Sequence, residues 1–87
     1  GMNISRQDLA VIVYNAAKAC SIDIPTDKQK TEFIDGGNIS DYAKEAVERL
    51  QLSGIISGYE DESFKPQGNA DRAEAAKIIH SLMQYIK

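Results

Sequence analysis

Two arginines stand at positions where a protein chain can hold an anion. Arg6 and Arg72 each follow the first residue of a predicted helix, Ser5 and Asp71. The opening turn of a helix has free backbone N–H groups and the positive end of the helix dipole, so an arginine there is slightly unfavourable unless an anion offsets its charge. The same geometry suits a bound carboxylate. The other interpretation is a structural salt bridge to Glu74, Asp71 or a loop acid, and both interpretations remain open.

Three segments of the chain carry apolar residues at steps of three and four, which is typical of one face of an amphipathic helix. They predict an all-α fold with helices near residues 5–20, 40–53 and 71–86, joined by two long ordered loops. We expect the three apolar stripes to face one another and to form the core. The stripes consist of Leu9, Ile12, Val13, Ala16, Ala17 and Cys20, then Ile39, Tyr42, Ala43, Ala46, Val47 and Leu50, then Ala75, Ala76, Ile79, Leu82, Met83 and Ile86.

The predicted helix starts are marked by capping residues. Ser5 is followed three residues later by Asp8, and Asp71 is followed by Glu74 at the same spacing. A short oxygen-bearing side chain at the first position accepts a backbone N–H of the opening turn, and the acid favours the positive end of the helix dipole. Ser40 is the candidate start of the second helix.

The two irregular segments, residues 21–38 and 54–70, are long for so small a domain. Gly54 stands where the second helix should end, because a residue free to adopt a positive φ is favoured there. Loops of this length are usually packed against the helices or carry function. The pair Ile55-Ile56 is a candidate for a very short strand, and we expect Tyr59 and Phe64 to anchor the second loop.

The first and third helices look like one element present twice, at an offset of 66 residues. At this offset the matched pairs are Arg6 and Arg72, Ala10 and Ala76, Ile12 and Ile78, Asp8 and Glu74, and Ser5 and Asp71. The chain therefore holds the end of one repeat followed by a complete one. Repeat units seldom bury their apolar faces alone, so stacking on a neighbour is expected.

The composition argues against several classes of function. The 87-residue chain carries a net charge of −3, whereas a duplex-binding protein normally has a basic face, so nucleic acid is not an expected partner. Its longest run of bulky aliphatic residues, Val11–Val13, is far too short for membrane insertion. Cys20 is the single cysteine, so no intramolecular disulfide or cysteine metal cluster is available, and we expect it to be a small core residue. No nucleophile–base pair, phosphate loop or metal-ligand spacing is visible, which predicts a protein that is not an enzyme and has no cofactor.

A longer set of residues forms an ordered motif. Along the chain it comprises Phe33-Ile34-Asp35, Tyr42-Ala43, Gly54-Ile55-Ile56-Ser57-Gly58-Tyr59, Asp61, Phe64, Pro66 and Asp71-Arg72-Ala73-Glu74. Their order and spacing resemble the S-layer homology domain family, in which Phe-x-Asp, a Trp-Ala helix start, Gly-Ile-x-x-Gly-Tyr, Phe-x-Pro and Thr-Arg-Ala-Glu follow one another. The segment Ile4–Asp8 resembles the closing-helix motif of a preceding repeat. Tyr42 stands where the family prefers Trp.

The resemblance implies one domain over residues 1–87, with 1–20 as the closing helix of a partial repeat and 33–87 as a complete helix-loop-helix repeat. It implies a non-catalytic module at the bacterial cell surface that anchors a protein to the cell wall by binding secondary cell-wall polysaccharide, often bearing ketal-linked pyruvate. The alternative is a protein-interaction or oligomerisation module on the same scaffold, pairing with itself or with other repeats. No signal peptide is visible, but Gly1 before Met2 resembles the remnant of a removed expression tag, so this absence does not argue against a location at the cell surface.

The resemblance also nominates binding residues. In the family, the Arg that opens the closing helix contacts the anionic sugar, the Asp and the aromatic residue of the opening motif assist it, and glycines let the backbone approach. By position these residues are Arg72, Asp35, Tyr42, Arg6, Gly54 and Gly58. Two structural alternatives stay open, a core position for Tyr42 and a turn cap for Asp35. We expect His80 to be solvated or half-buried, and the acidic run Glu60–Glu62 to be a solvated loop.

Overall fold

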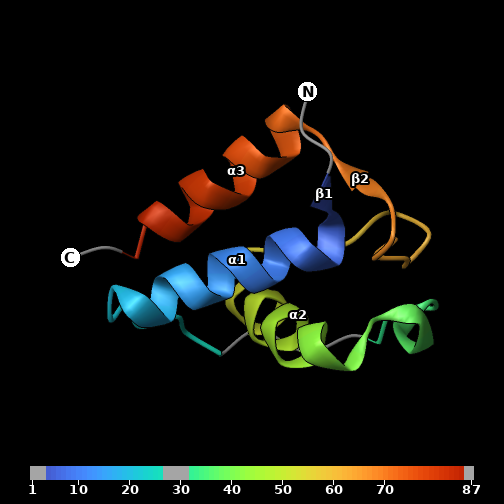
Figure 1. Ribbon diagram of the computed structural model, residues 1–87, viewed down its shortest axis with the longest axis horizontal. Helices are drawn as coiled ribbons and strands as arrows, with labels where there is room; N and C mark the ends of the chain where they lie inside the picture. Colours follow the sequence, from blue (N-terminus) through green and yellow to red (C-terminus); the bar gives the residue numbers. More distant parts are fainter. Residues whose placement is uncertain (1–3, 27–31, 86–87) are drawn as a thin grey trace.

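The computed structural model describes residues 4–26 and 32–85 of the chain. Within them the predicted all-α fold is confirmed: the three helices are α1 (Arg6–Ala19), α2 (Asp41–Ser53) and α3 (Arg72–Met83). A 3₁₀ turn, η1 (Gly36–Asn38), precedes α2. None of the described helices is long and apolar enough to cross a bilayer. Figure 1 shows α1 lying between α2 and α3.

The helices begin and end where their capping residues stand. The Ser5 hydroxyl accepts the backbone N–H of Asp8 at 3.2 Å, and the Asp71 carboxylate accepts that of Glu74 at 2.8 Å. The two matched helix starts are therefore built in the same way, as the internal repeat predicts. Gly54 ends α2 with a φ of 85°, a left-handed conformation that glycine adopts without strain. The α3 helix ends at Met83, three residues before the predicted end at residue 86. Gln84 and Tyr85 form a turn, and Ile86 lies outside the described residues.

Two very short strands join the starts of α1 and α3. They are β1 (Ile4–Ser5) and β2 (Asn69–Ala70), which pair antiparallel with Ile4 opposite Ala70. Ile4 and Ala70 are also matched at the offset of 66, so residues at equivalent positions of the two matched segments meet directly. The strand predicted at Ile55-Ile56 is wrong. Both residues instead lie in an irregular segment and pack into the core, where burial explains their apolar character.

The core draws on all three helices and on both loops. The α1 helix packs against both α2 and α3. Phe64 is buried as predicted, and its ring stacks on that of Phe33 with centroids 5.3 Å apart. The buried cluster consists of Leu9, Ala10, Val13, Ala17, Ile39, Ala43, Val47, Leu50, Ile55, Ile56, Phe64, Ala70, Ala75 and Leu82.

The expectation that whole stripes would be buried is wrong for part of each helix. The exposed stripe members are Ile12, Ala16, Cys20, Tyr42, Ala76, Ile79 and Met83. Each stripe is wider than the area that its neighbours cover, so residues at its edge reach solvent. The effect is largest on α3, where Ala75 and Leu82 are the buried residues. Cys20 lies just past the end of α1 and is exposed, so it is no core residue.

Candidate functional site

The two matched arginines have different environments. Arg6 forms an ion pair with Glu74, with 2.8 Å between Arg6 Nε and Glu74 Oε1, and the two side chains are 19% and 26% exposed. Its guanidinium also lies over the ring of Tyr59, 5.1 Å from the centroid. At Arg6 the structural interpretation, a salt bridge to Glu74, is therefore the one that the structure supports.

Tyr59 and Gly68 complete the surroundings of this ion pair. The Tyr59 hydroxyl donates to Glu74 Oε2 at 3.0 Å, and Lys65 Nζ lies 4.8 Å from the Tyr59 ring centroid. Burial and the neighbouring Glu74 carboxylate raise the pKa of Tyr59. A Cβ atom at Gly68 would collide with Arg6 Nη1, so the missing side chain makes room for the guanidinium. This role of Gly68 was not predicted from the sequence, although a glycine shortly before the helix-opening motif of α3 could have indicated a close approach of another group.

Arg72, the first residue of α3, is exposed. Within residues 4–26 and 32–85, its side chain has no hydrogen bond or ion pair. The two acids that could have neutralised it are otherwise engaged, since Asp71 caps α3 and Glu74 pairs with Arg6. The structural salt bridge considered for Arg72 is thus not found, and its guanidinium is open to solvent.

A surface groove lies between α3 and the loop that follows α2, and we call it the α3 groove. Its volume is about 430 Å³. Ile55, Ile56 and Phe64 provide apolar wall, and Lys77 and Ser57 provide polar groups. The predicted binding residues that line it are Arg6, Gly54 and Gly58. Among them, the glycines bring the main chain to the groove without a side chain in between.

Gly54 and Gly58 also have structural reasons to be glycine. Gly54 takes the left-handed conformation that ends α2, as described above. Gly58 has a φ of +78°, and a Cβ atom there would lie 2.5 Å from Phe33 Cε1 and 3.0 Å from the Ser63 carbonyl oxygen. The identity of these residues is therefore explained by the fold, with or without a ligand.

Tyr42 lies outside the α3 groove, against the start of α1. Its side chain is exposed, with 62% of the residue accessible, so the core interpretation is wrong. The Tyr42 hydroxyl donates to Asp8 Oδ1 and accepts from Gln7 Nε2 at 3.0 Å. The hydrogen bond to the Asp8 carboxylate is the main cause that raises the pKa of Tyr42. The hydrogen bonds to Asp8 and Gln7 thus fix the Tyr42 hydroxyl, whereas the ring of Tyr42 remains accessible to solvent.

Gln7 is a buried polar residue that sequence reasoning missed. Its Nε2 donates to Ser40 Oγ at 3.0 Å, and its Oε1 accepts the backbone N–H of Ser40 at 2.9 Å. Ser40 precedes α2 as predicted, but its hydroxyl serves Gln7 and makes no cap bond with its own helix. The sequence did contain a sign that Gln7 has a special role, because Gln7 stands where the family's helix-opening motif has Ala.

Asp35 holds two loops together. Its two carboxylate oxygens accept the backbone N–H groups of Phe64 and Lys65, each at 2.9 Å. The side chain makes no cap bond within its own 3₁₀ turn, so the turn-cap interpretation is wrong. Both carboxylate oxygens are therefore occupied by hydrogen bonds that hold residues 64 and 65 in place. These residues precede Gly68, which lies against the Arg6 guanidinium.

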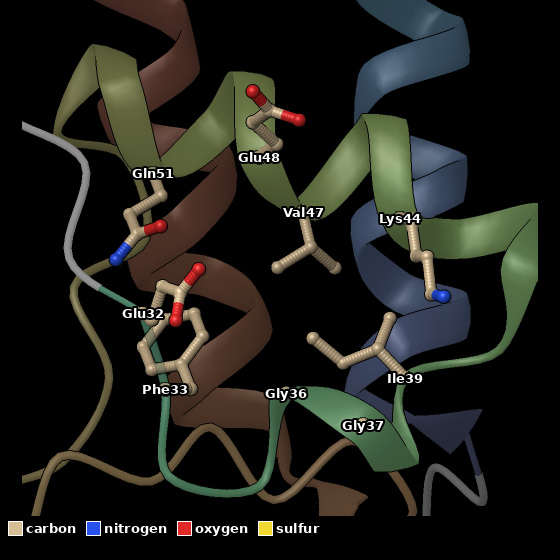
Figure 2. Close-up of a pocket in the computed structure, with 9 residues that line it drawn as sticks. All are labelled: Glu32, Phe33, Gly36, Gly37, Ile39, Lys44, Val47, Glu48 and Gln51. Carbon is tan, nitrogen blue, oxygen red and sulfur yellow. The ribbon is translucent and has the colours of Figure 1, made fainter.

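A second hollow, the α2 pocket, lies between α2 and the segment that precedes it, with a volume of about 360 Å³. Figure 2 shows Ile39 and Val47 between Lys44 at one end and Gln51 with Phe33 at the other. None of the predicted binding residues lines it. Its lining residues are Glu32, Phe33, Gly36, Gly37, Ile39, Lys44, Val47, Glu48 and Gln51.

The acidic run of the second loop has a structural role. Asp61 Oδ1 accepts the backbone N–H of Ser63 at 3.0 Å and its hydroxyl at 2.6 Å, and these hydrogen bonds lower the pKa of Asp61. The residues that the structure describes contain no group of side chains suited to a metal ion. His80 is exposed, in line with the expected solvated position.

Comparison with known protein families gives a match that covers just over half of the chain. The model of the S-layer homology domain matches residues 32–76. The chain belongs to the S-layer homology domain family. The match begins beside Phe33 and ends within α3, so it includes the loops, Asp35 and Arg72. No solved structure matches the chain significantly.

Several curated proteins carry a segment similar to this S-layer homology chain. It is 34% identical to an amylopullulanase of Thermoanaerobacterium thermosulfurigenes over 94% of the chain and 4% of the relative. It is 32% identical to a cellulosome-anchoring protein of Acetivibrio thermocellus over 94% of the chain and 18% of the relative. It is 46% identical to the outer membrane protein SlpA of Thermus thermophilus over 53% of the chain and 5% of the relative. The chain thus spans a small part of the length of each of these proteins.

Proposed function

We propose that this S-layer homology chain is a non-catalytic module that anchors a protein to the cell wall at the bacterial cell surface. Family membership and the similarity to a cellulosome-anchoring protein support this role. The relatives with enzyme names are far longer than the matched segment, so most of each of those chains lies outside it and can contain a separate catalytic domain. In this proposal residues 1–20 form the closing helix of a partial repeat, and residues 33–87 form a complete repeat.

The ligand in this proposal is a secondary cell-wall polysaccharide that carries an acidic group such as ketal-linked pyruvate. The observation that carries it is the Arg72 guanidinium, exposed and without an ion pair among the described residues. Because it stands at the first position of α3, a carboxylate bound to it would also meet the positive end of the helix. A planar guanidinium makes a two-point contact with a carboxylate.

The remaining predicted residues take graded roles in this proposal. Tyr42 offers an exposed ring on which a sugar face can stack. Gly54 and Gly58 offer main chain along the α3 groove. Asp35 and Arg6 support the loops through their own partners, and we assign them to positioning.

The test is a pull-down with purified bacterial cell walls, before and after removal of the wall polysaccharide. The wild-type chain should bind intact walls and lose binding once the polymer is removed. Arg72→Ala should lose most of the binding and keep its thermal stability, and Arg72→Lys should recover only part, because Lys cannot make the planar two-point contact. Arg49→Ala, which removes an exposed arginine on α2, is the matched control and should bind as the wild type does.

Two outcomes would overturn the sugar site. One is unchanged wall binding by Arg72→Ala, and the other is a large loss of stability in that variant. Binding should also weaken as salt is raised, since the contact is exposed. Wall binding that survives removal of the polysaccharide would favour the second candidate, a protein-interaction module. The exposed apolar residues of α3 are the observation that speaks for that candidate.

A further inference from the structure

Asp35 is followed directly by Gly36, and the chain contains no other Asp-Gly pair and no Asn-Gly pair. In an Asp-Gly pair the glycine amide nitrogen can attack the aspartate side chain, because glycine has no Cβ atom to hinder the approach. The product is a five-membered succinimide ring, and hydrolysis of this ring leaves isoaspartate. The sequence therefore contains one pair of residues with this reactivity, at the start of η1.

In the folded chain both reacting groups of this pair are occupied. The two Asp35 carboxylate oxygens accept the backbone N–H groups of Phe64 and Lys65, each at 2.9 Å, and we call these two hydrogen bonds the Asp35 clasp. The Gly36 N–H donates to the Phe33 carbonyl oxygen at 3.0 Å. Ring closure would break all three hydrogen bonds, because the Asp35 side chain would have to turn from residues 64–65 to its own main chain.

The backbone on either side of the Gly36 nitrogen is fixed as well. The Asp35 carbonyl oxygen accepts the N–H of Asn38 at 2.9 Å, and the Gly36 carbonyl oxygen accepts that of Ile39 at 3.1 Å. Ile39 is buried, which holds this turn against the core. The turn sets the ψ of Asp35 at 23°. The ring needs the Gly36 nitrogen on the same side of the Cα–C bond as Cβ, so the turn has to open before the reaction can occur.

We propose that Asp35-Gly36 is a self-modification site, which the Asp35 clasp suppresses in the folded protein and which opening of the loop releases. In the open loop the Gly36 nitrogen forms a bond to Asp35 Cγ, and one carboxyl oxygen leaves as water with the amide proton. Water then adds at the main-chain carbonyl carbon of Asp35, breaks its bond to the Gly36 nitrogen and leaves the chain connected through Cγ. One water leaves and one is taken up, so no oxidant or cofactor is required.

The modification destroys the clasp that suppresses it. Isoaspartate has one more carbon atom in the main chain, and its carboxylate is attached directly to Cα, so it cannot accept from residues 64 and 65 in the same geometry. The clasp lies beside the stacked rings of Phe33 and Phe64, so its loss loosens the contact between the two loops. Opening of the loop thus becomes permanent in each modified chain. This inference goes beyond the proposed function and does not depend on sugar binding.

The experiment follows isoaspartate in the intact 87-residue chain during storage in neutral buffer, with and without guanidinium chloride. Trypsin releases the peptide of residues 31–44, and electron-transfer fragmentation distinguishes isoaspartate from aspartate at equal mass. Isoaspartate at residue 35 should accumulate at least about tenfold more slowly in the folded chain than in guanidinium chloride, because the rate follows the fraction of chains with an open loop.

Two glycine variants test the chemistry. A Cβ atom at Gly36 or at Gly37 meets nothing within 4 Å, so both alanine variants should keep the fold. Gly36→Ala should slow the reaction severalfold in guanidinium chloride, because a Cβ atom next to the attacking nitrogen hinders its approach. Gly37→Ala is the matched control and should react as the wild type does, since residue 37 does not supply the nitrogen.

Phe33→Ala tests the clasp. Removing the ring that stacks on Phe64 should accelerate the reaction in the folded chain and leave the rate in guanidinium chloride unchanged. Leu82→Ala, which removes a buried side chain of α3, is the control for general destabilisation. For the same loss in free energy of unfolding, Phe33→Ala should accelerate the reaction more than Leu82→Ala does. Phe33→Leu repeats the test with a smaller change, should Phe33→Ala fail to fold.

Three results would overturn the proposal. The first is equally fast formation of isoaspartate at residue 35 in the folded and the unfolded chain. The second is an unchanged rate in Gly36→Ala. The third is an acceleration in the Phe33 variants that is no larger than in Leu82→Ala for the same loss of stability. None of these measurements uses wall polysaccharide, so a failed sugar site would leave this inference standing.

Discussion

At the scale of single residues, the main result is that one motif position serves two purposes. Arg6 and Arg72 both open a helix after a capping residue, yet Arg6 is paired with Glu74 and Arg72 is exposed. A guanidinium shielded between a carboxylate and the Tyr59 ring cannot be removed without leaving Glu74 unpaired in a poorly solvated place. An exposed guanidinium carries no such cost.

Arg6→Ala should therefore lower the free energy of unfolding by about 1–3 kcal/mol, as removal of one partner from a partly buried ion pair does. Arg72→Ala should change it by less than about 0.5 kcal/mol, as is usual for surface substitutions. Urea unfolding of both variants measures the difference. Equal effects of the two substitutions would contradict the division of roles.

The two engaged tyrosines predict a loss of stability in alkaline solution. The hydrogen bond to Asp8 raises the pKa of Tyr42 above the usual tyrosine value of about 10, and partial burial and the hydrogen bond to Glu74 do the same for the pKa of Tyr59. Above pH 10 an unfolded tyrosine gives up its proton while the folded one retains it, so stability should fall from pH 10 until the raised folded pKa is passed. Tyr42→Phe and Tyr59→Phe should each flatten this decline. Unfolding measured between pH 8 and about 12 tests it, and an undiminished decline in the double variant would rule it out.

At the scale of elements, the long loops are held by side chains from distant segments. Asp35 binds the backbone of residues 64–65, and the Phe33 ring packs on Phe64 and closes against Gly58. The described parts of both loops are thus ordered parts of the fold. The glycines of these loops differ in whether the structure has room for a side chain, so alanine substitutions at two of them can be compared.

Gly58→Ala should cost about 1–3 kcal/mol, because it combines a positive φ with a Cβ atom 2.5 Å from Phe33 Cε1. Gly36→Ala is the control: a Cβ atom there meets nothing within 4 Å, and its φ is not positive. It should be close to neutral. Thermal unfolding of the two variants checks the contrast, and a neutral Gly58→Ala would mean that the loop adapts freely.

At the scale of the whole molecule, one core unites the three helices. Leu50 is fully buried in the cluster that α1, α2 and α3 share. Leu50→Ala should cost about 2–4 kcal/mol through lost contacts and a cavity. Folded proteins are stable by about 5–15 kcal/mol and small domains lie near the lower end, so the variant should lose a large part of its stability. Ile79→Ala, which the helical period alone would place in the same class, should cost less than about 1 kcal/mol, because Ile79 is 46% exposed. Circular dichroism melts compare the two, and equal losses would contradict the single shared core.

Local chemistry was sufficient to predict the helices and the caps at Ser5 and Asp71. Capping at Ser5 and Asp71 acts over three residues, and helical periodicity acts over one or two turns, so both can be seen in the order of the residues. The motif that relates the chain to the S-layer homology family is likewise a matter of order and spacing.

Burial and pairing were decided in three dimensions. Arg6 and Arg72 have the same local signal, and only the position of Glu74 on a distant helix separates them. Tyr42, Cys20 and Ile79 fit an apolar stripe, yet they are exposed because no described neighbour covers their part of the helix surface. Gln7 is polar and belongs to none of the apolar stripes, yet it is buried because Ser40 and Tyr42 meet its amide. Periodicity tells which residues share a face, whereas burial depends on which other segment lies against that face, and that partner is set by the packing of residues far apart in the chain.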